Sequence, residues 1–274
     1  MSTGSHASGF ADVDGSDNPQ FFSDSLREQY EKNRNLRLNK QRTLELADIR
    51  TGQNVLDAGC GIGIDALKMA ALVGSSGHVF GIDLSQEMIA SAKNNAAGSS
   101  LPVTFRQGDI YQPDFEDNFF DRCRCDKTFQ HLAEPRKALS ELARVTKPGG
   151  KIIIADPDHD SLIIDTPFAG INQRFTRFRS DRMPQGSIAH QLYGLFKELG
   201  FSDVYVEPLA RAYTDYEEKK ITSPYLEEIW FAQEQGAVTR EEAEMWAAYL
   251  QEAIQSDRFL CLQTYVITVG TKAG

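Results

Sequence analysis

The residues with the clearest chemical signature form a glycine-rich turn between an apolar run and an alanine-rich, helix-like run. Residues 54–65 read N-V-L-D-A-G-C-G-I-G-I-D, with glycines at every second position: Gly59, Gly61 and Gly63. Glycine adopts backbone torsions that are closed to other residues, and it lets a ligand approach the main chain without meeting a Cβ atom. A ligand held by this turn would lie at the N-terminus of the following helix.

The spacing of the glycines argues against two common phosphate-binding turns. A dinucleotide fingerprint reads G-x-G-x-x-G, and this chain has Ile64 where that pattern needs its third glycine. A P-loop continues with lysine and then serine or threonine, whereas this turn continues with Ile64 and Asp65. Asp57 closes the apolar strand, and its carboxylate would repel a phosphate but suits a ligand that carries a cationic amine.

A second carboxylate predicts that the ligand contains a nucleoside. Asp83 ends the predicted strand 78–82, about 20 residues beyond the glycine turn. Nucleotide-binding α/β folds place an acid at this strand tip, where it binds the ribose hydroxyls. The turn and Asp83 therefore predict one adenosine pocket.

The motif D-A-G-C-G-I-G at 57–63 resembles motif I of the class I methyltransferases that use S-adenosylmethionine. Further motifs of this family follow in the expected order, so that the resemblance extends from Gln41 to Phe201. It implies that S-adenosylmethionine is the cofactor and S-adenosylhomocysteine its product. The cofactor-binding residues predicted from the residues and the resemblance together are Tyr30, Asp57, Gly59, Cys60, Gly61, Asp83, Leu84, Met88, Gly108, Asp109, Ile110 and Asp126.

The resemblance also implies roles for several of these residues. Leu84 and Met88 lie where the family flanks the adenine, and Asp109 in G-D-I lies where the family's motif III acid binds the adenine amino group. Tyr30 is a lid candidate, because N-terminal helices of similar methyltransferases fold over the cofactor. Simple packing remains an alternative for Met88 and Tyr30, and a solvated turn remains an alternative for Asp109.

His131 is the predicted catalytic residue. It lies in the segment 126–132 after the fourth predicted strand, and in this fold the carboxyl ends of the strands face the ligand. If the acceptor is a hydroxyl or an amine, its proton must leave, and an imidazole titrates near neutral pH. A structural role or a cofactor contact is the alternative for His131. Enzymes that methylate exocyclic amines of bases typically have an asparagine or aspartate, two prolines and an aromatic residue here, whereas this segment begins D-K-T-F and lacks the prolines.

The elements that must position these residues alternate between strands and helices. Strands are expected at 54–57, 78–82, 103–107, 119–125, 151–155, 203–207 and 258–268. Helices at 24–38 and 39–46 precede them, and further helices separate most of the strands. The resulting fold class is α/β, a doubly wound, Rossmann-like, seven-stranded and mostly parallel sheet with an antiparallel last strand.

The domain organisation predicted from the sequence is a tail followed by one methyltransferase domain. Residues 1–20 are rich in glycine, serine and aspartate and are expected to be mobile, and residues 21–274 form the domain. Within it, residues 21–49 form lid helices, and the insertions 157–186 and 210–256 form caps over the substrate site. The apolar stripe of the second insertion, from Ala243 to Ile254, is expected to be core.

Two features near these insertions have more than one interpretation. Asp156, Asp158, His159 and Asp160 crowd one strand tip, where hard oxygens and an imidazole could bind a metal, but a polar loop at the pocket edge is the preferred interpretation and no metal is expected. Arginines and phenylalanines interleave in 168–182, which suits a substrate cap, a solvated helix face or, less well, nucleic acid.

Composition restricts the partners and the compartment. The formal net charge of −10 and the pI of about 5.1 argue against a nucleic-acid substrate. No run of about 18 apolar residues exists, so no membrane span is expected, and a cytosolic location follows. The four cysteines have no zinc-ligand spacing and are expected to be buried thiols. A homo-oligomer formed through the N-terminal helices stays open.

These features together predict a methyltransferase that acts on a small, largely apolar acceptor at oxygen, nitrogen or carbon, in specialised or cofactor metabolism. Methylation of nucleic acid or protein is the alternative within the same class. A nicotinamide-dependent dehydrogenase and a non-catalytic nucleoside-binding module are the alternatives from other classes.

Overall fold

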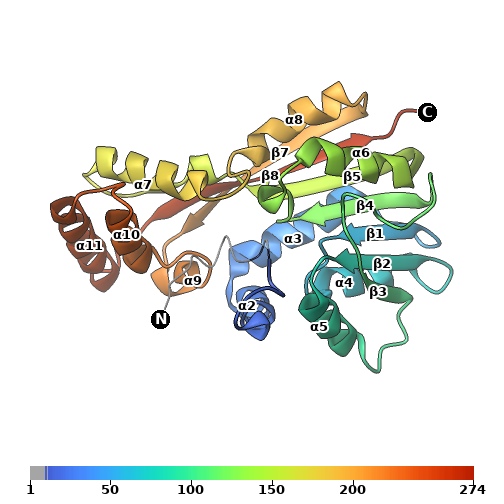
Figure 1. Cartoon of the computed structure of the whole chain (residues 1–274), viewed down its shortest axis with the longest axis horizontal. Coiled ribbons are helices and arrows are strands. Elements are labelled where there is room, and N and C mark those ends of the chain that lie inside the picture. Colours follow the sequence, from blue (N-terminus) through green and yellow to red (C-terminus); the bar gives the residue numbers. More distant parts are fainter. Residues whose placement is uncertain (1–9, 11) are drawn as a thin grey trace.

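A twisted eight-stranded sheet forms the centre of the computed structural model, which describes residue 10 and residues 12–274 (Figure 1). The strand order is β3-β2-β1-β4-β5-β8-β6, with β7 also paired to β8. The strands are β1 (Asn54–Ala58), β2 (His78–Asp83), β3 (Val103–Gln107), β4 (Phe120–Asp126), β5 (Thr146–Pro157), β6 (Ile163–Ile164), β7 (Ser202–Tyr213) and β8 (Cys261–Thr271).

The pairing confirms the predicted mixed α/β sheet. β1 to β5 are parallel to one another, and β8 is antiparallel to β5, to β6 and to β7. β6 is a short strand that the sequence did not predict. β5 and β7 extend beyond the predicted 151–155 and 203–207, because β8 pairs with both along most of its length.

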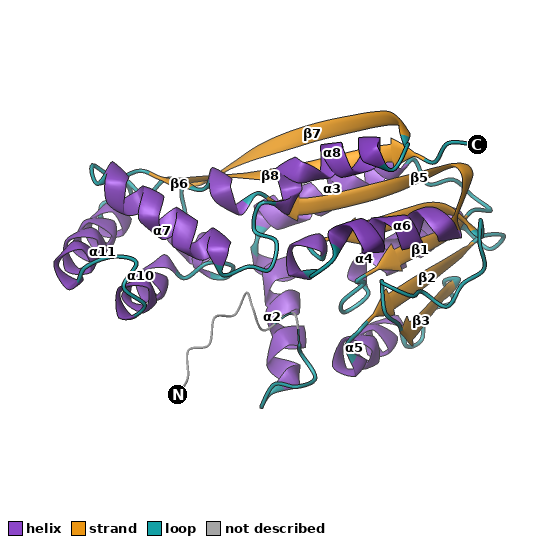
Figure 2. Cartoon of the chain, turned by 45° about the horizontal axis from the view of Figure 1, so that its top comes forward, coloured by secondary structure: helices purple, strands orange, loops and turns teal. Residues whose placement is uncertain are grey.

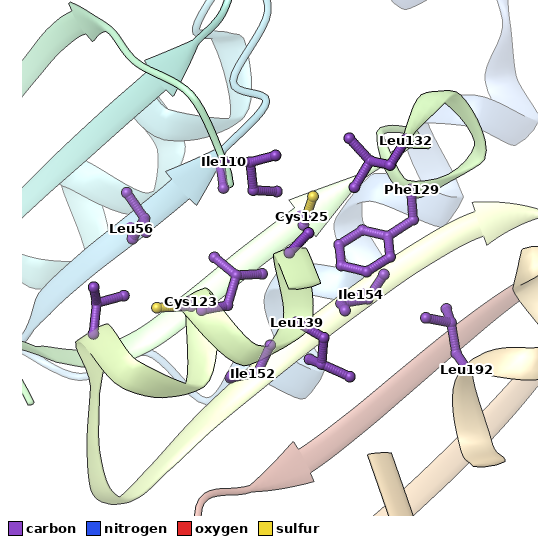
Figure 3. Packing of buried hydrophobic residues seen from close by; sticks show 14 of the residues in the cluster. Leu56, Ile110, Cys123, Cys125, Phe129, Leu132, Leu139, Ile152, Ile154 and Leu192 are labelled. Carbon is purple, nitrogen blue, oxygen red and sulfur yellow. The ribbon is translucent and has the colours of Figure 1, made fainter. Parts of the chain in front are cut away.

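Helices cover both faces of the sheet (Figure 2). The side chains of β1 alternate between the faces: Val55 packs with α4 and α5, whereas Leu56 joins the cluster with α6 and α8. Figure 3 shows this second cluster, in which Leu139 of α6 and Leu192 of α8 surround Ile154. The helices are α2 (Pro19–Lys32), α3 (Arg34–Ala47), α4 (Ile64–Val73), α5 (Gln86–Ala96), α6 (Pro135–Val145), α7 (Ala169–Asp181), α8 (Ile188–Glu198), α9 (Tyr216–Lys220), α10 (Tyr225–Glu234) and α11 (Arg240–Gln255).

The two N-terminal helices meet at Asn33 and not at the predicted boundary near Leu38. The Asn33 side chain accepts a hydrogen bond from the backbone N–H of Leu36 at 2.8 Å and so caps α3. Asn39 was expected to begin the second helix, but it lies inside α3. The first helix also begins earlier than predicted, at Pro19, because proline is well suited to the first turn.

The insertions fold together into a lobe beyond the carboxyl ends of the parallel strands (Figure 1). α7, α10 and α11 share an apolar cluster with the far ends of β7 and β8, and Phe175, Tyr225 and Trp246 are fully buried in it. The stripe on α11 is core as predicted, since Ala243, Trp246, Ala247 and Leu250 are buried and Ile254 packs against them. Thr239 and Glu242 form the expected capping box.

Part of the predicted tail packs against the domain. Val13 is buried with Phe22, Ile62 and Met88, and Phe10 lies against the same cluster. The low apolar content of this segment concealed the fact that its few apolar side chains have a long-range contact. Residues 1–9 and 11 of the predicted tail lie outside the described residues.

Candidate active site

A cavity of about 910 Å³ lies where the parallel strands end, between the glycine turn, α2 and α3, and the lobe. Segments that are far apart in the sequence line it, as expected for an α/β sheet whose ligands bind at the carboxyl ends of its strands. The sequence-predicted residues that line it are Tyr30, Gly59, Cys60, Gly61, Asp83, Leu84, Met88, Gly108, Asp109, Ile110, Asp126 and His131. Asp57 does not line it.

The glycine turn has the backbone that its sequence requires. Gly59, Gly61 and Gly63 all have positive φ angles, 73°, 51° and 77°. A Cβ atom at Gly59 would lie 2.2 Å from the Thr128 hydroxyl oxygen, and one at Gly63 would lie 2.7 Å from the Phe105 ring. The turn is therefore closely packed on its inner side, while Gly59 and Gly61 also border the cavity.

Asp83 connects the glycine turn to the loop after β2. Its carboxylate accepts hydrogen bonds from the backbone N–H of Gly61 at 2.9 Å and of Ser85 at 3.1 Å. Burial raises the pKa of Asp83 above its ordinary value. Because each carboxylate oxygen can accept two hydrogen bonds, capacity remains for a ligand's hydroxyl groups.

Asp14 lies next to this loop and was not predicted. Its carboxylate accepts hydrogen bonds from the Ser85 hydroxyl at 2.5 Å and from the backbone N–H of Gln86 at 2.6 Å, at the N-terminus of α5. The neighbouring Val13 and Phe10 line the cavity. The contact joins residues 71 positions apart, so no local sequence pattern signals it.

The predicted adenine-binding residues form one wall of the cavity. Leu84 is 61% exposed at its edge, whereas Met88 and Ile110 are buried. Met88 both lines the cavity and packs with Phe22, so the two interpretations of this residue are compatible. Asp109 likewise agrees with both of its interpretations. It borders the cavity, and its exposed carboxylate accepts a hydrogen bond within the turn from the backbone N–H of Tyr111 at 2.8 Å.

Asp57 belongs to a buried ionic network and does not line the cavity, so its contact with the cofactor stays a prediction. Its carboxylate accepts a hydrogen bond from Arg124 at 3.1 Å. The same guanidinium binds Asp65 at 3.0 Å and Asp126 at 2.7 Å, and Lys40 binds these two aspartates at 2.7 and 3.2 Å. Asp126 lies at the cavity wall while it shares Arg124 and Lys40 with Asp65, whereas Asp57 lies outside the lining.

Arg124 is a functional residue that the sequence interpretation missed. It joins the end of β1, the first turn of α4 and the end of β4, and its Nε also donates to the Thr43 hydroxyl of α3 at 2.9 Å. Its side chain is only 3% exposed. The available signal was D-R-C-R-C-D at 121–126, where charged residues alternate within a strand that neighbouring strands enclose on both sides.

His131 lies at the cavity with one ring nitrogen unused. Its Nδ1 is buried and has no hydrogen-bond partner in the described part of the chain. Burial and the nearby Lys127 charge lower the pKa of His131 to about 4. The imidazole is therefore neutral at pH 7 and can accept a proton, although as a weaker base than free histidine.

Tyr30 of α2 has the position of the predicted lid. It lines the cavity, and the Lys68 ammonium lies 4.7 Å from the centre of its ring. The cation packs the ring against α4 while Tyr30 borders the cavity, and its role as a lid stays a prediction.

The four acidic and imidazole residues after β5 do not converge. Asp156 is fully buried below the cavity and His159 lines it, while Asp158 and Asp160 lie near His190 at the surface. The surface groups already have partners, because Asp158 binds His190 at 3.0 Å and Asp160 accepts from the Ser187 hydroxyl at 2.6 Å. The four cysteines are free and buried, as predicted. Burial raises the pKa of Cys60 well above its usual range, so this cavity residue is a thiol and not a thiolate.

Comparisons with known proteins agree on one family, the methyltransferases. A family model described as a methyltransferase domain matches residues 49–196, more than half of the chain. An uncharacterized 37.1 kDa protein in transposon TN4556 of Streptomyces fradiae is 39% identical over 174 residues, 63% of this chain and 50% of the relative. A ubiquinone/menaquinone biosynthesis C-methyltransferase of Bdellovibrio bacteriovorus is 35% identical over 117 residues, 43% and 49% of the two chains. Phosphoethanolamine N-methyltransferase 1 of Arabidopsis thaliana is 35% identical over 167 residues, which are 60% of this chain and 32% of the relative. The chain thus spans half or less of the length of these relatives.

Solved structures share the fold. Phosphoethanolamine N-methyltransferase 2 of Haemonchus contortus, in complex with phosphomonomethylethanolamine and S-adenosylhomocysteine, has a TM-score of 0.63 at 22% identity, covering 97% of this chain and 60% of that one. The YcgJ protein of Bacillus subtilis has a TM-score of 0.63 at 20% identity, covering 87% of this chain and 99% of that one. Within the described residues, no helix has the length and apolar character needed to cross a membrane.

Proposed function

The chain belongs to the family of methyltransferase domains, and from this membership we propose that it transfers a methyl group from S-adenosylmethionine to a small-molecule acceptor. One observation carries the proposal: the glycine turn, Asp83 and the Gly108–Ile110 loop border one cavity at the carboxyl ends of the strands. These are the groups that bind a nucleoside in an α/β fold.

The residues present fit S-adenosylmethionine. Gly59 and Gly61 border the cavity without a side chain, Asp83 has acceptor capacity for ribose hydroxyls, and Met88 and Ile110 offer an apolar surface to a base. Asp126 brings a carboxylate to the wall, where a cationic amine would bind. When bound, S-adenosylmethionine supplies an electrophilic methyl group on a sulfonium.

The chain's own residues then have two tasks. The cavity walls hold the acceptor in line with the methyl group and exclude water, and such positioning contributes about 7–11 kcal/mol in well-oriented reactions. His131, neutral at pH 7 and with Nδ1 free of protein partners among the described residues, accepts the proton of a hydroxyl or amine acceptor. A general base of this kind contributes about 10²–10⁴-fold.

A small molecule is the acceptor class that the cavity supports. The lobe lines one side of the cavity, which at about 910 Å³ suits a cofactor together with a small substrate. The curated relatives carry names that refer to quinone and phosphoethanolamine methylation. This range agrees with an acceptor from specialised or cofactor metabolism.

Calorimetric titration tests the proposal. Purified protein is titrated with S-adenosylhomocysteine and, separately, with oxidised and reduced nicotinamide dinucleotides. We expect micromolar binding of the first alone, weakened about tenfold or more in Asp83→Ala because the hydrogen bonds to the ribose are lost. Glu116→Ala, which removes an exposed carboxylate outside the cavity, serves as the matched control. Binding of a dinucleotide instead would overturn the proposal.

A further inference from the structure

The lobe side of the cavity contains cationic groups that are not matched by carboxylates. Lys219 of α9 is 2% exposed, and its ammonium donates to the Gln263 side-chain oxygen at 3.0 Å. Lys127 is partly buried and donates to the Gln29 side-chain oxygen at 3.1 Å. Within residue 10 and residues 12–274, neither ammonium has a carboxylate oxygen within 4 Å.

Arg179 of α7 adds an unused donor at the same place. Its side chain is 9% exposed, its Nε binds Glu228 at 2.7 Å and its Nη2 donates to the Ser223 hydroxyl at 3.1 Å. The remaining nitrogen, Nη1, is buried and has no hydrogen-bond partner in the part of the chain that the structure describes. A buried donor without a partner is costly to a protein, unless a ligand provides the acceptor.

Three independent features indicate that these groups face one region. Lys127, Arg179 and Lys219 all line the same cavity. The pKa of the buried His159, which lies beside them, is lowered to about 3 by burial and by the positive charges of all three. Lys127 also has a φ angle of 58°, a strained conformation for a lysine, in which its backbone N–H binds the Ala155 oxygen at 2.8 Å.

The acidic residues of the cavity do not neutralise this region. Asp65 and Asp126 are paired with Arg124 and Lys40, and Glu228 is paired with Arg179. Asp156 also interacts electrostatically with Lys127, but it is fully buried outside the lining, and burial raises its pKa well above the ordinary value, which favours the uncharged form. Asp83 lies at the glycine turn. The other acids of the lining are exposed, namely Asp24, Glu28, Asp109 and Glu227. The aromatic faces of Tyr213 and Tyr225, 4.6 and 5.5 Å from the Lys219 ammonium, offset only part of its buried charge.

We infer that the acceptor carries an anionic group, a carboxylate or a phosphate, which binds between Lys219, Arg179 and Lys127 at the lobe side of the cavity. The inference rests on the proposed function and specifies its substrate class. An anion there receives charge-assisted hydrogen bonds from three separate elements, α7, α9 and the loop after β4. The anchored acceptor then extends across the cavity toward His131.

The test measures binding of simple anions to the protein saturated with S-adenosylhomocysteine. The probes are phenyl phosphate and benzoate, each compared with a neutral analogue, benzyl alcohol and benzamide. We expect at least one anion to bind, the neutral analogues to bind about tenfold more weakly or not at all, and Lys219→Met to weaken the anion about tenfold or more. Lys197→Met, which removes an exposed ammonium of α8 outside the cavity, should leave anion binding unchanged.

The two anions identify the anionic group of the acceptor. Tighter binding of phenyl phosphate indicates a phosphate on the acceptor, and tighter binding of benzoate indicates a carboxylate. Lys127→Met provides a second variant if Lys219→Met does not fold. Neutral probes that bind as well as the anions, or an unchanged anion affinity in both lysine variants, would overturn this inference while S-adenosylhomocysteine still binds. Loss of S-adenosylhomocysteine binding in the wild-type protein would instead count against the proposed function.

Discussion

Removing the guanidinium of Arg124 should destabilise the protein more than any single surface change. Arg124→Met leaves Asp57 without an ion-pair partner among the described residues and leaves Asp65 and Asp126 with the lysines alone. Breaking a buried ion pair by removing one partner costs about 3–5 kcal/mol, because a buried charge remains uncompensated. Urea unfolding at pH 8 followed by circular dichroism measures this free energy.

A second substitution separates the ionic contribution from lost packing. Asp57→Asn in the Arg124→Met background removes one of the unpaired carboxylates and should recover a substantial part of the loss, since the two residues are directly bonded. Arg122→Met is the control on the same strand, because Arg122 donates to the backbone oxygens of Ala47 and Asp121. A loss of about 2 kcal/mol or less is expected for it.

The loss of unfolding free energy in Arg124→Met should depend on pH, with a definite sign. Burial already raises the folded-state pKa of Asp57 to about 6, and without Arg124 it rises further. The folded variant then binds a proton that the unfolded chain, with its pKa near 3.9, has lost, so stability falls as pH rises. The deficit should therefore grow between about pH 6 and 8. A deficit below about 1 kcal/mol, or one equal to that of Arg122→Met at every pH, would refute the reasoning.

Three further predictions concern His131 and Asp14. His131→Ala should lower turnover about tenfold or more while the affinity for S-adenosylhomocysteine hardly changes, and a wild-type rate would exclude the proton-accepting role. Because the pKa of His131 is about 4, its neutral form predominates above pH 5, so the wild-type turnover should show no acid limb between pH 6 and 8. Asp14→Ala should cost about 1 kcal/mol in thermal unfolding, since the N-terminus of α5 loses its contacts, whereas the exposed Asp12→Ala should change little.

The parts of the fold that the sequence predicted well are those with local causes. The positive φ angles of Gly59 and Gly61, the strand tip at Asp83 and the capping box at Thr239 all follow from a few neighbouring residues. The loop residues that border the cavity were found through their order along the family's motifs. Their identity was therefore readable without knowledge of the three-dimensional contacts.

The parts that were missed depend on pairing across the chain. The boundary at Asn33 was misplaced by several residues, because an asparagine inside a continuous polar pattern is visible as a cap only in the structure. Asp14 reaches the N-terminus of α5 from the N-terminal segment, and Lys219 reaches the cavity from the second insertion. A lysine in a short helix resembles any solvated lysine until its burial is known.

Asp57 illustrates why a motif alone does not fix the role of each of its residues. The motif predicts a carboxylate at the end of β1, and the structure has one there, but the cation that it binds is Arg124 of the adjacent strand β4. Asp126, two residues after Arg124 on the same strand, shares that guanidinium and borders the cavity. The carboxylate that borders the cavity is therefore part of this network, and β1, α4 and α3 are held together by the same bonds. A substitution at Arg124 should accordingly weaken cofactor binding as well as folding, although its side chain does not line the cavity.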